Sequence, residues 1–174
     1  MKLIKILGGI CVIAACAYTG FFMGVVLQRR KVLLLQLQSC ALQLRAQIRH
    51  ERTPMPEALI SISQGKKGPV GDMFKSISRQ MLEYSGVPTE EIWQANISGF
   101  LTGTAVSEGD MQALNRLGSS IGNLDSRMQD EVLSVYIEEL ESTIEILGDE
   151  IRRKTGFYRM MGVLTGVFIT IILL

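Results

Sequence analysis

Two uncharged apolar stretches, one toward each end, constrain this sequence more than any other feature. The first runs from Ile6 to Leu27 and the second from Met160 to Leu174. The first stretch, if helical, is about 33 Å long, which is enough to cross the hydrocarbon core of a bilayer. The sequence therefore predicts a membrane helix in residues 1–28, a second one in residues 157–174, and a helical domain in residues 29–156.

Two other interpretations of the first stretch compete with a membrane helix. A secretory signal peptide has a shorter apolar core and a polar start of the mature chain, and neither is present here. The residues Ile13-Ala14-Ala15-Cys16 resemble a lipidation box, but the residues that follow Cys16 remain apolar. We therefore favour a membrane helix.

Positive charges beside the two stretches predict the orientation of the domain. Arg29, Arg30 and Lys31 follow the first stretch, and four further cations precede the second one, namely Arg152, Arg153, Lys154 and Arg159. Because Lys and Arg accumulate on the cytoplasmic side of membrane helices, we expect a cytoplasmic domain in a protein of the cell membrane with two spans.

Each apolar stretch contains a Gly-x-x-x-Gly step. These steps are Gly20 with Gly24 and Gly162 with Gly166. Small residues one turn apart let membrane helices approach closely, so these glycines are candidates for helix packing, either within one chain or between copies in a homo-oligomer.

The central domain has the periodicity of helices throughout. Apolar residues recur at steps of three and four, and no strand-like alternation is found. The fold class predicted is therefore all-α, a compact bundle of about six helices between the two membrane helices. Proline, glycine and capping residues divide the bundle into helices near residues 32–50, 56–64, 70–84, 89–101, 107–121 and from 125 onward.

Several local features of these helices can be predicted. Ser107 and Thr89 are suited to cap the helices that follow them, and Asp125 is placed to cap the last helix. Gly118 should allow a close helix contact, and Gly122 should end its helix in the left-handed conformation. The apolar stripe predicted for the last helix is Met128, Val132, Val135/Tyr136, Leu140, Ile144, Leu147 and Ile151.

Charge is distributed unevenly along the domain. Residues 29–79 hold ten Lys or Arg against three acids, whereas residues 90–150 hold thirteen acids against two Arg. This asymmetry predicts either pairing between the early and the late helices or an acidic face that binds a basic partner. The candidate partner-binding residues are acidic residues of the last helix, namely Glu138, Glu139, Glu141 and Glu145.

Catalytic and metal chemistry find little support in the sequence. His50 is the only histidine, and the three cysteines have no ligand spacing. The carboxylates of the last helix could suggest a di-metal site, but the Glu-x-x-His pairs of such bundles are absent. We predict no enzyme activity, no cofactor and no nucleic-acid partner.

Two motifs resemble those of the stage III sporulation protein AB family. One is a Thr-Pro-Leu-Pro-Glu-Ala-Leu segment, which here has Met55 and contains Thr53, Pro54, Pro56 and Glu57. The other is a Leu-Gly-x-x-Leu-Gly-x-x-Asp-x-x-x-Gln run, which here has Ile121 and contains Leu117, Gly118, Gly122, Asp125 and Gln129. The resemblance covers nearly the whole chain, and the family is similar to the cytoplasmic domains of the inner-membrane platform protein of type II secretion and type IV pilus systems.

The resemblance implies a role in the transport apparatus between mother cell and forespore. The protein is expected in the mother-cell membrane around the forespore, as a non-enzymatic platform or adaptor. Its expected partners are the ATPase named stage III sporulation protein AA and other stage III sporulation membrane components. The alternative that remains is a membrane-anchored helical sensor or scaffold unrelated to secretion.

Overall fold

The computed structural model describes the backbone of residues 2–173 except 52, 84–85 and 123–124, and the side chains of residues 24–154 except these five and residues 51 and 126. The helices are α1 (Lys2–Ala46), a π-helical turn η1 (Gln47–Glu51), α2 (Met55–Gln64), α3 (Pro69–Leu82), α4 (Thr89–Leu101), α5 (Glu108–Ile121) and α6 (Ser126–Leu173). Six α-helices and no strand are present in this described part, which confirms the all-α prediction.

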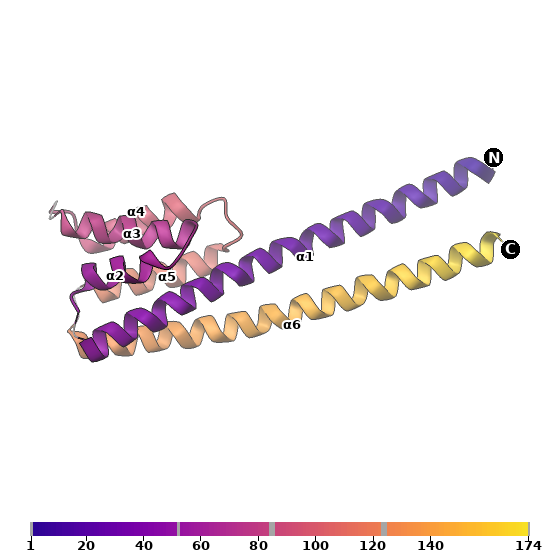
Figure 1. Ribbon diagram of the computed structural model, residues 1–174. Coiled ribbons are helices and arrows are strands. Elements are labelled where there is room, and N and C mark those ends of the chain that lie inside the picture. The colour runs from indigo at the N-terminus through magenta and orange to yellow at the C-terminus, as the bar shows by residue number, and fades with distance from the viewer. Residues whose placement is uncertain (1, 52, 84–85, 123–124, 174) are drawn as a thin grey trace. The chain divides into compact units, whose positions relative to one another are not determined.

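The chain divides into two compact units, which we treat separately. One comprises residues 1–29 and 145–174, and the other comprises residues 30–144. In the second unit, α2 packs on α3, α3 on α4 and α4 on α5, and Figure 1 shows these short helices side by side. This unit is the helical bundle, and all the sites discussed below lie in it unless stated otherwise.

The unit of residues 1–29 and 145–174 contains the two predicted membrane stretches. Among the helices in the described part of the chain, none is both long and apolar enough to span a bilayer. The predicted stretches 6–27 and 160–174 lie almost wholly outside the residues whose side chains are described. The described end of α6 has two ion pairs between residues three or four apart, Arg152 with Asp149 and Lys154 with Glu150.

The core of the bundle forms around Trp93. This side chain has no exposed surface, and its ring meets that of Phe74 edge to face with a centroid distance of 6.0 Å. Buried apolar side chains from all six helices complete the core, among them Leu34, Leu37, Leu44, Leu59, Ile77, Ile97, Leu114 and Leu133. Trp93 is thus the core anchor, as an aromatic side chain at an apolar helix position usually is.

Most helix boundaries agree with the sequence predictions. The helix predicted to begin near Pro56 begins at Met55 and reaches Gln64, with Pro56 in its first turn. The first helix of the domain ends as an α-helix at Ala46 rather than His50, and its last turn is the π-helical segment η1. Gln47 in this turn donates a hydrogen bond to the hydroxyl of Ser61 on α2 (2.9 Å), which ties the turn to the next helix.

Two predictions about helix ends were wrong. Thr89 is not a cap, because Pro88 precedes the helix and no side-chain cap bond is made. Gly122 is not left-handed, since its φ is −68°. Both residues instead serve a close contact, in which a Cβ on Gly122 would lie 2.8 Å from Cγ2 of Thr89. Lack of a side chain, rather than backbone conformation, is what this position requires.

Candidate functional site

The residues of α6 that are buried in the core differ in part from those that the sequence predicted. Leu133, Tyr136, Ile137 and Leu140 are buried, whereas Val135 is 65% exposed. Met128 is exposed as well, so the predicted stripe was wrong at Met128 and Val135. It is confirmed at Tyr136, which was predicted as the alternative to Val135, and at Leu140 and Leu147, all of which are buried. Two overlapping apolar stripes run along this helix, and the one beginning at Leu133 faces the core.

The predicted partner-binding acids all lie on exposed parts of α6. Glu138, Glu139 and Glu141 belong to the bundle, whereas Glu145 belongs to the other unit. Glu139 pairs with Arg116 of α5 at 2.8 Å, and Glu141 accepts a hydrogen bond from Gln38 of α1 at 3.2 Å. Glu138 has no ion pair with any residue in the described part of the bundle. The acids therefore differ in how far they are already engaged.

A groove of about 360 Å³ lies between α5 and α6 beside these acids. Apolar side chains line most of it, including Val132, Val135 and Leu117. Arg116 and Glu139, which pair with each other, line it as well. Tyr136 also lines the groove, and its hydroxyl has no hydrogen-bond partner among the described residues. Burial and then the nearby acids Asp110 and Glu139 raise the pKa of Tyr136, so the phenol stays neutral.

A second set of charges holds the bundle together at the start of α5. Arg30 of α1 donates two hydrogen bonds to the carboxylate of Asp110, from Nε at 2.8 Å and from Nη2 at 2.9 Å. The side chain of Asp110 is only 7% exposed. This bidentate geometry is among the strongest that charged groups form in proteins.

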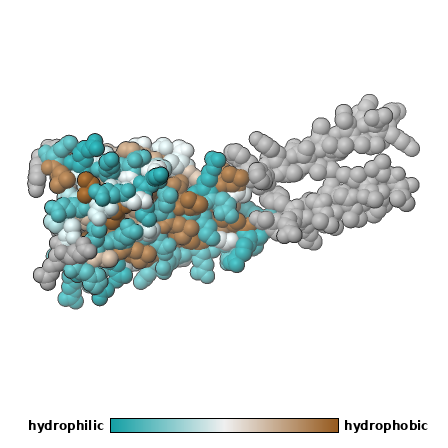
Figure 2. Space-filling view, in the orientation of Figure 1, coloured by the Kyte–Doolittle hydropathy of each residue, from teal (hydrophilic) through white to brown (hydrophobic). Residues whose placement is uncertain are grey.

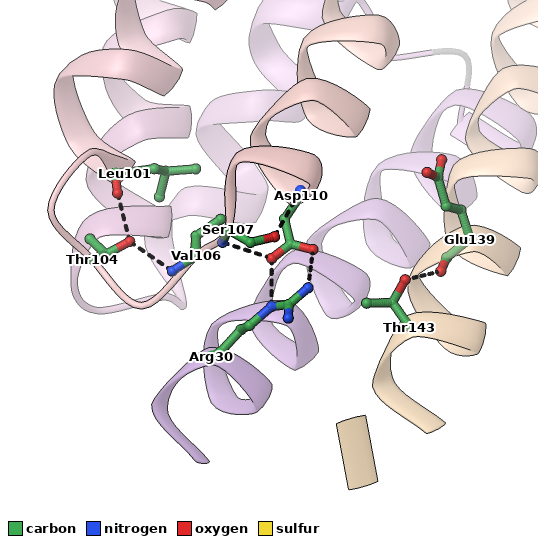
Figure 3. A network of polar contacts seen from close by, with 8 residues as sticks. All are labelled: Arg30, Leu101, Thr104, Val106, Ser107, Asp110, Glu139 and Thr143. Carbon is green, nitrogen blue, oxygen red and sulfur yellow. Dashed lines mark hydrogen bonds and ion pairs between the residues drawn. The ribbon is translucent and has the colours of Figure 1, made fainter. Parts of the chain in front are cut away.

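Asp110 also completes a capping box with Ser107. The N–H of Ser107 donates to Oδ2 of Asp110 at 2.9 Å, and the N–H of Asp110 donates to the Ser107 hydroxyl at 3.2 Å. Figure 3 shows Arg30 reaching this cap from α1. Ser107 as a cap is thus confirmed, and Asp110 takes the place that Glu or Gln usually has.

Opposing effects act on the pKa of Asp110. Burial alone raises it, but the hydrogen bonds from Arg30 and Ser107 and the charge of Arg30 outweigh burial, so the pKa lies below its usual value. The carboxylate is therefore ionised at neutral pH. It cannot serve as a proton donor there, and its role is to join α1 to α5.

The loop before this cap is ordered by its own hydrogen bonds. The hydroxyl of Thr104 donates to the carbonyl oxygen of Leu101 at 2.6 Å and accepts from the N–H of Val106 at 3.3 Å. Gly103 has a φ of 81°, which favours glycine at this turn. These contacts, drawn in Figure 3, position Ser107 and Asp110 beside Arg30.

A third contact joins α1 to α6. Arg45 donates from Nε to Asp130 at 2.7 Å. This hydrogen bond, with the charges of Arg45, Arg49 and His50, holds the pKa of Asp130 below its usual value despite some desolvation. The predicted pairing of early basic helices with later acidic ones is thus confirmed at Asp110 and Asp130.

The residues of the second motif build the turn between α5 and α6. Leu117 is buried, and a Cβ on Gly118 would lie 2.7 Å from ring atoms of Trp93, so the predicted close contact is confirmed. Asp125 accepts from the N–H of Met128 at 2.9 Å, which confirms it as a cap. Gln129 donates to the carbonyl oxygen of Ile121 at 2.9 Å and so satisfies the end of α5.

The residues of the first motif form the entry to α2. Pro54 precedes the helix, and Pro56 and Glu57 stand in its first turn. Ser78 of α3 donates a hydrogen bond to the carbonyl oxygen of Pro56 at 2.6 Å. Thr53 also has an interaction partner. Within the described residues, both motifs therefore stabilise the bundle and do not form an exposed site.

The remaining predicted residues concern the membrane helices. Gly20, Gly162 and Gly166 lie outside the residues whose surroundings are described, and Gly24 has open space where a Cβ would stand. Helix packing at these glycines stays a prediction. In the described part of the chain, no group of three His, Cys, Asp or Glu residues is placed to hold a metal ion.

The architecture defines a class of protein. It is an all-α bundle with internal ion pairs and with exposed acids on its last helix. The sequence matches the family model for stage III sporulation protein AB over residues 5–174, and the chain belongs to this family. Membership in the family gives the protein a role in sporulation.

Two relatives support the assignment. Stage III sporulation protein AB of Bacillus subtilis (strain 168) is 21% identical over 172 residues, which cover 99% of this chain and 100% of that protein. A solved structure of a stage III sporulation protein AB superposes with a TM-score of 0.65 at 19% identity, over 71% of this chain and 97% of that one. The latter similarity shows that the two share a fold.

Proposed function

We propose that this protein is a non-enzymatic membrane adaptor of the apparatus that joins mother cell and forespore. Membership in the sporulation family supports the setting. The observation that carries the mechanism is the contrast on α6, where Asp130 is held by Arg45 while Glu138 has no ion pair in the described part of the bundle. Acids that the bundle does not use for itself are available to a partner.

The partner we propose is the cytoplasmic ATPase, stage III sporulation protein AA, with other stage III sporulation membrane components as further neighbours. Exposed acids on one helix attract a basic surface and speed its approach. Glu138 and Glu141 are the leading residues, and Glu139 can leave Arg116 because an ion pair with this much exposure contributes little. Glu145 lies on the part of α6 that belongs to the other unit, and we propose it as a partner-binding residue separately from these three acids.

We further propose that the chain is anchored in the mother-cell membrane by residues 1–28 and 157–174, with the bundle in the cytoplasm. The uncharged runs 6–27 and 160–174 and the cations that flank them on the side of the bundle support this topology. A reporter enzyme that is active only outside the cytosol, inserted between the exposed residues Gly86 and Val87, should stay inactive. Activity of that reporter would reject a cytoplasmic bundle.

Charge reversal tests the docking surface. Full-length Glu138→Arg/Glu141→Arg protein should co-purify with the ATPase at least about tenfold less than the wild type, because two attractive contacts become repulsive. The matched control is Glu83→Arg/Glu91→Arg, which makes the same charge change at two exposed acids, one directly after α3 and one in α4. Equal losses for both variants, or none for the first, would exclude this surface.

A further inference from the structure

The groove between α5 and α6, here called the α5–α6 groove, has an apolar floor that the bundle leaves partly open. Ala113 and Leu117 of α5 line it and are buried, whereas Val132 of α6 is half-buried and Val135 is 65% exposed. Apolar side chains also lie among polar ones on the face shown in Figure 2, and scattered exposure of this kind is normal. The α5–α6 groove differs because its apolar side chains line one hollow of about 360 Å³.

Acids stand at both ends of the α6 side of this groove. Glu131 is the first and Glu139 is the last of the α6 residues that line it. They are eight residues apart on one helix, which corresponds to about 12 Å. Glu138 adds an exposed carboxylate next to Glu139. The α6 side of the groove is therefore apolar in the middle and acidic at both ends.

Neither of the two end acids is held firmly by the bundle. Glu131 meets Arg127 only at 3.9 Å, and these side chains are 70% and 91% exposed. Glu139 pairs with Arg116, which also lines the groove, and both of these side chains are exposed. Ion pairs with this much exposure contribute little to stability. A cation from outside can therefore share or replace them.

These features favour a helix with bases at both ends as the occupant. The main-chain groups of α5 and α6 are bonded within each helix, so a partner contacts side chains, and an amphipathic helix that lays its apolar face into a hydrophobic groove is the recognition mode that fits. Two acids eight residues apart match Lys or Arg residues two turns apart. A second copy of this groove would bring acids against acids, and anionic lipids would be repelled.

We propose that the α5–α6 groove binds an amphipathic helix of a partner protein. Its apolar side chains contact Val132 and Val135, and a Lys or Arg at each end pairs with Glu131 and Glu139. The inference rests on the proposed function, since it takes the ATPase as the protein that carries this helix. It goes further in making apolar contact, and not charge alone, the source of specificity. One base of the helix then competes with Arg116 for Glu139.

An added acid on the floor of the groove separates apolar contact from attraction by charge alone. Val135→Glu makes the surface more acidic, so binding by charge alone would keep or raise the affinity for the ATPase. The proposal instead predicts at least about fivefold weaker binding of purified ATPase to the full-length protein in detergent, because a charge replaces an apolar contact. The matched control is Val87→Glu, at an exposed valine just before α4, which should bind like the wild type.

The outcomes distinguish the groove from the wider docking surface. Unchanged or stronger binding of Val135→Glu, or equal losses in both variants, would overturn the groove as the binding site. The proposed function would survive that result as long as Glu138→Arg/Glu141→Arg weakens co-purification. If that charge reversal has no effect, the acidic docking surface itself is rejected.

A second variant should change the affinity in the opposite direction. Arg116→Ala frees Glu139 for the base of the partner helix and should tighten ATPase binding about threefold, as expected when an exposed ion pair no longer competes. The matched control is Arg79→Ala, which removes the same charge from an exposed position of α3 and should leave the affinity unchanged. Equal affinities of the two variants, or weaker binding of Arg116→Ala, would overturn the placement of a base at Glu139.

Crosslinking identifies the occupant. A photoreactive residue at position 135 of the full chain, irradiated with purified ATPase, should capture a peptide in which apolar residues lie between Lys or Arg residues about seven or eight positions apart, which is two helical turns. Capture of a second copy of this chain, or of an ATPase segment without that pattern, would overturn the proposal.

Discussion

Two arginine–carboxylate pairs in the bundle have the same nitrogen–oxygen distance but contribute differently to the stability of the fold. Arg30 with Asp110 and Arg116 with Glu139 both measure 2.8 Å between nitrogen and oxygen. The exposed side-chain fractions are 25% and 7% in the first pair but 63% and 46% in the second. The first pair is locked into a helix cap, whereas water competes for every group of the second. Contact distance therefore does not tell which acids maintain the fold and which are available to a partner.

Removal of the buried carboxylate should have the largest effect. Asp110→Ala is expected to lower the free energy of unfolding by about 3 kcal/mol, because charge-assisted hydrogen bonds and a helix cap are lost together. Thermal or denaturant unfolding of the full chain in detergent measures it. Asp110→Asn should fall between this variant and the wild type, and a loss no greater than that of a surface variant would contradict the role given to Asp110.

A substitution at the tight contact between α4 and α5 should have the next largest effect on stability. Gly118→Ala should destabilise the bundle by about 2 kcal/mol, because the new methyl group would stand 2.7 Å from the ring of Trp93. Gly99→Ala on α4 is the matched control, since a Cβ there meets nothing within 4 Å. The control should be neutral or slightly stabilising, as Ala is a better helix former than Gly. Comparable losses in both variants would argue against the contact with Trp93.

Acid should weaken the buried pair. The pKa values of Asp110 and Asp130 are lowered in the folded protein, so their contribution to stability is present above the unfolded pKa of about 3.9 and is lost as the pH falls through the folded values. Stability should therefore decline below about pH 4, and more gently in Asp110→Asn. An unchanged acid profile in that variant would show that Asp110 does not titrate as described.

The exposed pair should have the smallest effect. Arg116→Ala is expected to change the free energy of unfolding by less than about 1 kcal/mol, and less still at high salt. A loss of more than about 2 kcal/mol would place Glu139 among the structural acids and remove it from the proposed docking surface.

The fold of the bundle could be predicted from local signals wherever one residue decides the outcome. Ser107 and Asp125 cap their helices as expected, and Gly118 makes the close contact that its position indicated. Periodicity found only part of the inward face of α6, namely Tyr136 and Leu140. Two apolar stripes overlap on this helix, and packing against the neighbouring helices buries Leu133 rather than Val135. Tertiary contacts, not local preference, also explain Thr89 and Gly122.

The candidate site was harder to predict than the fold. Arg30 and Asp110 are 80 residues apart, and the only sequence signal for their pairing was the excess of bases early and acids late. The charge excess could not show which acids form internal ion pairs. Asp130 and Glu138 are both acids of the last helix, and only the structure shows that an arginine reaches Asp130.

The most direct test of the account is in-cell photo-crosslinking from α6 in sporulating cells. A photoreactive residue at position 138 should capture the ATPase, whereas the same residue at position 83, exposed on another part of the bundle, should not. Capture at both positions or at neither would contradict the claim that the acids left over from the fold are the ones that make the contact.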